Sequence, residues 1–192
     1  ESLPENQRKA YLEGNWDAFD EGMDEKGYIR LISDRELQAS LTSETEHSGY
    51  VIAGVDPAAG GDNSAIVIKS AHLMEIVFSQ KLQNTMDLVS AIVDIGRKYK
   101  VDYWVVDRTG VGQGVWDKLK DMSYPVRGVS FGEKSDDSQY HNLKAEWHFR
   151  LRKWLISGNK LKNDYGWNEF EYVRYKHKDG KITIQPKEDL LR

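Results

Sequence analysis

From residue 50 onward, hydrophobic and polar residues follow patterns that predict a regular series of strands and helices. Short apolar or alternating runs rich in β-branched and aromatic residues are typical of strands, whereas apolar residues three and four apart indicate helices. The expected strands are 50–55, 64–70, 73–82, 103–106, 125–131, 170–176 and 181–185, and the expected helices are 85–99, 113–122 and 142–156. The first three strands predict an antiparallel meander, which helix–strand units follow. The last two predict a hairpin across Asp179-Gly180.

Each of the three expected helices has a side that should face the core, which helix 85–99 forms with Leu88, Ile92 and Ile95. Helix 113–122 is expected to direct Val115, Leu119 and Met122 toward the core, and helix 142–156 is expected to be strongly amphipathic. The segment before residue 50 is polar and acidic instead. Its first residues show a capping-box pattern that predicts a short helix over 4–13, and a second short helix is expected over 34–41.

The charge is unevenly distributed, although its net value is only −4. Residues 1–49 carry 5 basic and 12 acidic side chains, whereas residues 141–192 carry 12 basic and 7 acidic ones together with several Trp and Tyr. Basic residues interleaved with aromatic ones fit a surface that binds a polyanion. They fit an ordinary solvated surface over an aromatic core equally well.

Several classes of protein are excluded by what the sequence lacks. It contains no cysteine, which excludes disulfides and thiolate metal sites. No apolar stretch reaches the roughly 18 to 20 residues of a membrane span. No phosphate-binding Gly-x-x-x-x-Gly-Lys-Ser/Thr motif occurs, and the Gly-rich run 110–115 departs from a dinucleotide fingerprint because residue 115 is Val. The chain begins at Glu1 and stops at Arg192 within a pattern, as expected for a piece of a longer polypeptide.

Two aspartates are the main candidates for chemistry. Asp56 follows the apolar strand 50–55, Asp107 follows 103–106, and a loop of small residues comes after each. In a ribonuclease-H-like arrangement the fourth strand lies parallel beside the first, so both carboxylates would meet at one sheet edge. Paired carboxylates provide the oxygen ligands that a hard divalent cation such as Mg²⁺ or Mn²⁺ prefers. Each Asp also fits the simpler role of capping a loop or a helix.

Four stretches of the chain are similar to motifs of a known family. They are Leu3-Pro-Glu-Asn-Gln-Arg8 with Tyr11-Leu-Glu-Gly-Asn-Trp16, Gly54-Val-Asp-Pro-Ala-Ala-Gly-Gly-Asp-Asn-Ser64, Val106-Asp-Arg-Thr-Gly-Val-Gly-Gln-Gly114, and Asn142-Leu-Lys-Ala-Glu146. In their order and spacing they resemble the C-terminal nuclease domain of the large terminase subunit of tailed bacteriophages, which cuts DNA during packaging. The resemblance covers essentially the whole chain.

This resemblance implies an α/β fold, namely a ribonuclease-H-like mixed sheet flanked by helices, with a C-terminal β-hairpin. Residues 1–49 would be a linker segment from an upstream ATPase domain, packed on the nuclease, and residues 50–192 a nuclease domain with an incomplete C-terminal end. It further implies two-metal-ion hydrolysis with Mg²⁺ or Mn²⁺, in which Asp56 bridges two ions and Asp107 holds one. The third acid of the family would lie beyond Arg192, with Asp189 or the adjacent Glu as a weaker alternative.

The implied substrate is double-stranded DNA, and the implied partners are the upstream ATPase domain of the same polypeptide, the small terminase subunit and the portal protein. The protein would act at the procapsid in the host cytoplasm, with no membrane involved. Five basic residues are expected to contact DNA phosphates: Arg108, Lys144, Arg150, Arg152 and Lys153.

Weaker candidates each have an ordinary structural alternative. Asp62 would assist metal binding indirectly or simply cap its loop. His141, His148 and His177 would touch phosphate or activate water, or would be surface histidines. The glycines after Asp107 would let the backbone approach a DNA phosphate, or would allow a tight strand-to-helix turn.

Three other functions remain compatible with the sequence. A nucleotide-binding domain of the actin and sugar-kinase type shares the meander and an Asp followed by small residues, although that fold comes as two lobes. A junction resolvase uses the same scaffold and would prefer branched DNA. A non-catalytic DNA-docking domain also fits, because the third acid is expected to lie outside the chain.

Overall fold

The computed structural model describes residues 23–43 and 46–186. The expected helix over 4–13, Glu188 and Asp189 lie outside this part of the chain. The described residues divide into two compact units. One comprises 40–43, 46–133 and 158–166, and the other comprises 23–39, 134–157 and 167–186. The division into a linker over 1–49 and a nuclease domain over 50–192 stays a prediction.

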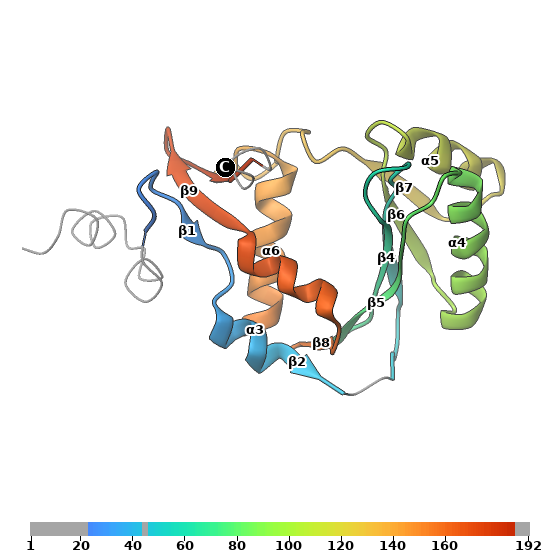
Figure 1. Cartoon of the computed structure of the whole chain (residues 1–192), viewed down its shortest axis with the longest axis horizontal. Coiled ribbons are helices and arrows are strands. Elements are labelled where there is room, and N and C mark those ends of the chain that lie inside the picture. Colours follow the sequence, from blue (N-terminus) through green and yellow to red (C-terminus); the bar gives the residue numbers. More distant parts are fainter. Residues whose placement is uncertain (1–22, 44–45, 187–192) are drawn as a thin grey trace, which may run out of the picture. The chain divides into compact units, whose positions relative to one another are not determined.

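The first unit is built on a seven-stranded mixed sheet (Figure 1). In spatial order the strands are β2 (Leu41–Thr42), β8 (Lys160–Lys162), β5 (Leu73–Gln80), β4 (Ser64–Lys69), β3 (Ile52–Asp56), β6 (Tyr103–Asp107) and β7 (Val126–Val129). Strands β3, β4 and β5 form the predicted antiparallel meander. Strand β6 pairs in parallel with both β3 and β7. The ribonuclease-H-like mixed sheet expected from the sequence is therefore confirmed.

Two helices, α4 (Thr85–Tyr99) and α5 (Gly112–Asp121), cover one face of this sheet (Figure 1). Between them and the strands lies a hydrophobic core, which includes Val55 of β3 and Val106 of β6. The side chain of Asn84 accepts the N–H of Met86 and caps α4, which begins at residue 85 as predicted. Helix α5 ends one residue before Met122, which is 38% exposed, so the prediction that Met122 points inward was wrong.

The second unit has a three-stranded antiparallel sheet and a long helix. The sheet consists of β1 (Ile29–Arg30), β9 (Arg174–Lys178) and β10 (Lys181–Ile184), and the helices are α3 (Asp34–Ser40) and α6 (Leu143–Ile156). The predicted hairpin turn is confirmed, because Asp179 and Gly180 both have the positive φ, 52° and 74°, that a two-residue turn of this kind needs. The ring of Phe149 packs edge-on against Tyr175, with 4.8 Å between centroids.

Two expectations for this part of the chain needed correction. Residues 170–172 were predicted as strand, but they belong to a 3₁₀ helix, η1 (Tyr165–Tyr172). Helix α6 was predicted to be strongly amphipathic, yet one of its few buried side chains is the carboxylate of Glu146. That carboxylate accepts a hydrogen bond of 2.6 Å from the hydroxyl of Ser135, which compensates for its burial. The helix is therefore held by polar contacts as well as by an apolar side.

Candidate metal centre

Asp56 and Asp107 lie next to each other at one edge of the seven-stranded sheet. Strands β3 and β6 pair in parallel register up to Val55 and Val106, and each Asp is the next residue of its strand. Neighbouring strands are about 4.8 Å apart, so the two positions are direct neighbours. Because successive side chains point to opposite faces, and Val55 and Val106 are buried on the helix-covered face, both carboxylates lie on the other face. The structure thus brings together the two residues on which the metal prediction depends.

The local contacts hold Asp107 without neutralising it. One oxygen of its carboxylate accepts the backbone N–H of Thr109 at 2.9 Å, which bends the chain as it leaves β6. Arg108, the adjacent cation, donates to Glu133 at 2.9 Å, and its guanidinium lies 6.0 Å from the ring centroid of Trp116. Asp56 is exposed, whereas Asp107 is half-buried. Asp107 is thus held by a backbone N–H, and the charge of Arg108 is engaged by Glu133.

The glycines after Asp107 serve the tight turn between β6 and α5. Gly110 has a φ of +58°, which favours glycine. A β-carbon at Gly112 would lie 1.8 Å from the carbonyl oxygen of Asp107, which leaves no room for a larger residue. Around Gly114 a β-carbon would meet nothing within 4 Å. The turn therefore explains Gly110 and Gly112, and a close approach to a phosphate stays a prediction.

A buried serine fixes the loop that follows Asp56. The hydroxyl of Ser64 donates to the carbonyl of Ala58 and accepts its N–H, both at 3.0 Å. The N–H of Gly60 donates to the carbonyl of Leu82 at 3.1 Å, which ties the same loop to the end of the meander. Asp62 is exposed in this loop, and an indirect role in metal binding stays a prediction.

The donor set at this edge suits a hard divalent cation. Carboxylate oxygens are the ligands that Mg²⁺ and Mn²⁺ prefer, and an exposed edge leaves space for water to complete the coordination. Within residues 23–43 and 46–186, no group of three or more His, Cys, Asp or Glu side chains gathers in one place. The candidate ligands in this part of the chain are Asp56 and Asp107, and a third acid beyond Arg192 stays a prediction.

Among the predicted DNA contacts, several side chains already have acidic partners. Arg150 pairs with Glu146 at 2.5 Å, and Arg152, only 17% exposed, pairs with Glu36 at 2.9 Å. Lys153 is exposed in the last turn of α6, and Lys144 is half-buried near its start. A phosphate contact by each of these residues, as by Arg108, stays a prediction.

The three candidate histidines differ in their surroundings. His141 and His177 are exposed. His148 is largely covered, and its Nδ1–H donates to the carbonyl of Lys144 at 2.7 Å within α6. Burial lowers the pKa of His148, because the charged imidazolium is poorly solvated there. His148 is therefore not the surface histidine that the simpler interpretation expected.

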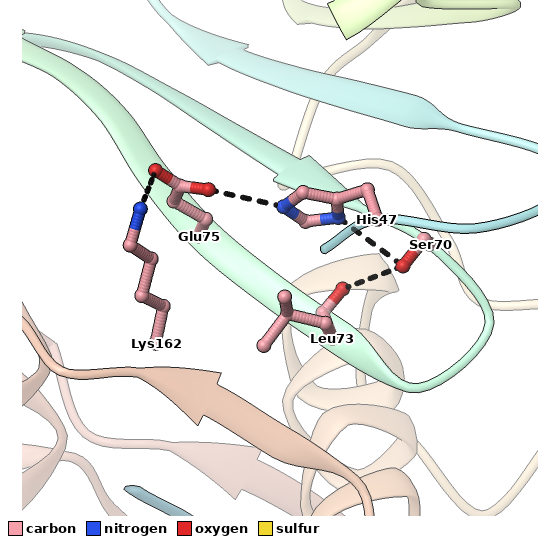
Figure 2. Close-up of polar contacts among 5 residues, drawn as sticks. All are labelled: His47, Ser70, Leu73, Glu75 and Lys162. Carbon is pink, nitrogen blue, oxygen red and sulfur yellow. Dashed lines mark hydrogen bonds and ion pairs between the residues drawn. The ribbon is translucent and has the colours of Figure 1, made fainter. Parts of the chain in front are cut away.

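A buried polar cluster that the sequence analysis missed joins three segments of the first unit (Figure 2). The carboxylate of Glu75, on β5, lies 3.1 Å from Nε2 of His47 and 2.6 Å from Nζ of Lys162 on β8. Nδ1 of His47 lies 3.1 Å from the hydroxyl of Ser70. The signal in the sequence was an acidic residue at a core-facing position of an apolar strand.

The Ser70–His47–Glu75 series has the residue types of a nucleophilic triad, but its environment indicates a structural role. Ser70 is only 3% exposed, so a substrate has no access to its hydroxyl. The second oxygen of Glu75 is occupied by Lys162, and the hydroxyl of Ser70 also contacts the carbonyl of Leu73. The cluster holds the segment before β3 and the short strand β8 against β5.

A meander followed by a parallel strand, with paired aspartates where the first and fourth strands end, defines a ribonuclease-H-like domain. The chain belongs to the family of terminase RNase H-like domains, whose model matches residues 53–185. None of the curated protein sequences matches the chain significantly. In the part of the chain that the structure describes, no helix is long and apolar enough to span a bilayer.

Solved structures show the same fold. The nuclease domain of the large terminase subunit gp2 of bacterial virus Sf6 is 14% identical, with a TM-score of 0.69 over 84% of this chain and 90% of that one. The large terminase nuclease of thermophilic phage G20c is 16% identical, with a TM-score of 0.63 over 82% and 89%. A form of the G20c nuclease with bound magnesium is 16% identical, with a TM-score of 0.62 over 84% and 92%.

Proposed function

We propose that this protein is a metal-dependent endonuclease that cuts double-stranded DNA during viral genome packaging. The observation that carries the proposal is the parallel register of β3 and β6, which sets Asp56 beside Asp107 on one face of the sheet. Membership in the terminase RNase H-like family supports the setting. The magnesium-bound form of the G20c nuclease supports a divalent ion as cofactor.

In this proposal Asp56 and Asp107 would hold the Mg²⁺ or Mn²⁺ ions through their carboxylate oxygens. When bound, such ions supply a nucleophilic water and stabilise the departing oxygen of a phosphodiester. The protein positions the two carboxylates through strand register, the Thr109 N–H fixes one oxygen of Asp107, and Ser64 fixes the loop beyond Asp56. A third carboxylate ligand is expected from outside the described residues.

The wider setting of this function is part of the same proposal. We place the protein with an upstream ATPase domain, a small terminase subunit and a portal protein, acting on DNA in the host cytoplasm. The actin-type nucleotide-binding alternative also has a meander. It is less favoured because the terminase RNase H-like model matches residues 53–185, which include both the meander and the later strands.

The test is plasmid nicking in Mn²⁺ by the wild-type chain and by three variants, Asp56→Ala, Asp107→Ala and the exposed control Asp94→Ala. We expect the wild type and Asp94→Ala to nick and linearise circular DNA at many positions. Loss of either candidate ligand should lower the rate by more than about 100-fold, because even residues that only support metal ligands are worth roughly 10–100-fold.

Equal cleavage by the wild type and Asp56→Ala would show that a different site or a contaminating nuclease was responsible. Binding of duplex DNA without cleavage would leave a docking role on the same scaffold. Cleavage of a four-way junction but not of a linear duplex would favour a resolvase instead.

A further inference from the structure

One face of the three-stranded sheet in the second unit carries a row of cations. Along β9, Tyr175 is buried and packs on Phe149 of α6. His177 lies on the same side of the strand, with 6.3 Å between its ring centroid and that of Tyr175. Side chains alternate in a strand, so Arg174, Lys176 and Lys178 point to the other face. The register of β10 places Lys181 beside Lys178 on that same face.

The hairpin itself offers these cations little acidic charge. Asp179, at the exposed tip of the turn, is the only acid in the segment 174–184. Within residues 23–43 and 46–186, no ion pair involves Lys176, Lys178 or Lys181. This distinguishes them from Arg150 and Arg152 of α6, whose charges acidic side chains already engage.

One lysine of this row packs against an aromatic ring. The ammonium of Lys176 lies 4.1 Å from the ring centroid of Tyr28, which is buried just before β1. A cation held over an aromatic ring keeps its charge at the surface while its stem is ordered. The ammonium of Lys176 therefore lies beside the turn that precedes β1.

A pocket of about 290 Å³ opens where this row meets the turn before β1. Its lining includes Lys26 and Gly27 of the turn together with Lys176, His177 and Lys178 of β9. The carboxylate of Asp24 accepts the backbone N–H groups of Lys26 and Tyr28, at 2.9 and 2.8 Å, and so fixes the turn. Lys26 is thereby held near the lysines of β9, on an opening large enough for a phosphate group.

We propose that the cation face, defined as Lys26, Arg174, Lys176, Lys178 and Lys181, binds the phosphate backbone of duplex DNA. The pocket beside Lys26 and Lys178 would receive one of the phosphates. Contacts of lysine with phosphates carry no sequence information but supply affinity and fix orientation. This assignment rests on the proposed nuclease function, whose substrate it would hold, and it moves the main phosphate contacts from α6 to the hairpin.

The test is binding of a fluorescent 30-base-pair duplex to the whole chain in EDTA, at several salt concentrations, so that affinity is read without cleavage. The hairpin variant is Lys176→Gln/Lys178→Gln/Lys181→Gln, and its matched control is Arg97→Gln/Lys98→Gln/Lys118→Gln on α4 and α5. The hairpin variant should bind at least 10-fold more weakly at about 100 mM salt. A plot of the logarithm of the binding constant against the logarithm of the salt concentration should have a slope smaller in magnitude by about 2 to 3. Each phosphate contact contributes roughly 0.9 to this slope, and three lysines are removed. The control should bind as the wild type does.

The double variant Lys178→Gln/Lys181→Gln keeps Lys176 over Tyr28, and it should show a slope smaller by about 2 with unchanged thermal stability. Hairpin variants that bind DNA with wild-type affinity and slope would overturn the proposal, as would wild-type protein that does not bind the duplex. If the hairpin variants lose affinity for polyglutamate but not for DNA, the face would instead bind an acidic protein partner, and the proposal would also be overturned. Binding that depends on the hairpin, with cleavage that does not depend on Asp56, would refute the nuclease proposal but not this one.

Discussion

A β-carbon at Gly112 would lie 1.8 Å from the carbonyl oxygen of Asp107, so the first turn of α5 rests directly on the end of β6. The same β-carbon would lie 3.3 Å from the ring of Pro57, the residue after Asp56. The backbone at Gly112 therefore touches the neighbourhood of both candidate metal ligands. A residue with no acid or base function of its own sets how closely the helix approaches the site.

The first prediction concerns this contact. Gly112→Ala should lower the free energy of unfolding by on the order of 1–3 kcal/mol, because backbone must move to accommodate the methyl group. Gly114→Ala, two residues later in the same helix where space is open, should be neutral or stabilising by up to about 1 kcal/mol. Urea denaturation of both variants measures the difference. Equal stabilities would show that the turn at Gly112 is not under steric constraint.

The second prediction concerns repulsion between the paired carboxylates. Without metal, Asp56→Asn and Asp107→Asn should each raise the melting temperature by a few degrees, because two like charges close together disfavour the folded state. Mn²⁺ should raise the melting temperature of the wild type and much less that of either variant, since only the wild type holds both ligands. Differential scanning fluorimetry with EDTA and with Mn²⁺ gives both numbers.

The exposed control for this experiment is Asp94→Asn on α4, which changes the net charge equally. It should respond to Mn²⁺ as the wild type does. If all three variants keep the full Mn²⁺ shift, the ion binds elsewhere and the pair at the sheet edge is not a metal site.

Elements with a local signal could be predicted from the sequence. Helix α4 was expected over 85–99 and spans Thr85–Tyr99, because Asn84 caps its start and apolar spacing runs through it. The pairing of β3 with β6 was also predictable, since a meander followed by a helix–strand unit brings the fourth strand beside the first. Short strands were missed, as with β8, whose three residues are strand only because β5 and β2 flank them.

Contacts between distant residues could not be predicted, and they changed the interpretation of charged side chains. Arg152 is predicted to bind phosphate, and in the structure it pairs with Glu36, which is 116 positions away in the sequence. Lys162 and Glu75 are 87 positions apart. Which of many acids meets which base depends on the tertiary arrangement, and one sequence contains no periodicity that reports it.

The third prediction concerns the buried cluster around Glu75. Glu75→Gln should lower the free energy of unfolding by about 1–3 kcal/mol, because Lys162 loses a charged partner and His47 loses a carboxylate acceptor. Since Lys162 is about a third exposed (32%), water softens the effect. Glu169→Gln, at an exposed position, is the matched control and should change little.

A double-mutant cycle separates the pair from its surroundings. Lys162→Met combined with Glu75→Gln should be less destabilising than the sum of the two single changes, because the cost of an unpaired cation disappears with Lys162. Strict additivity would mean that the 2.6 Å contact contributes no coupling to stability.

The last prediction uses pH to examine His148. Burial lowers the pKa of this histidine in the folded protein, so the unfolded chain binds a proton at a higher pH than the folded chain does. Below the ordinary histidine value of about 6.5, the unfolded state therefore binds more protons, and stability falls as the pH falls through this range.

His148→Gln removes the titrating group but keeps a side-chain amide that donates hydrogen bonds. Between pH 7.5 and 5.5 the free energy of unfolding should drop more for the wild type than for His148→Gln, whereas above pH 7.5 the two curves should run parallel. Urea titrations across this range measure the difference, and wild-type and variant curves that stay parallel down to pH 5.5 would show that His148 is charged in the folded protein at little cost.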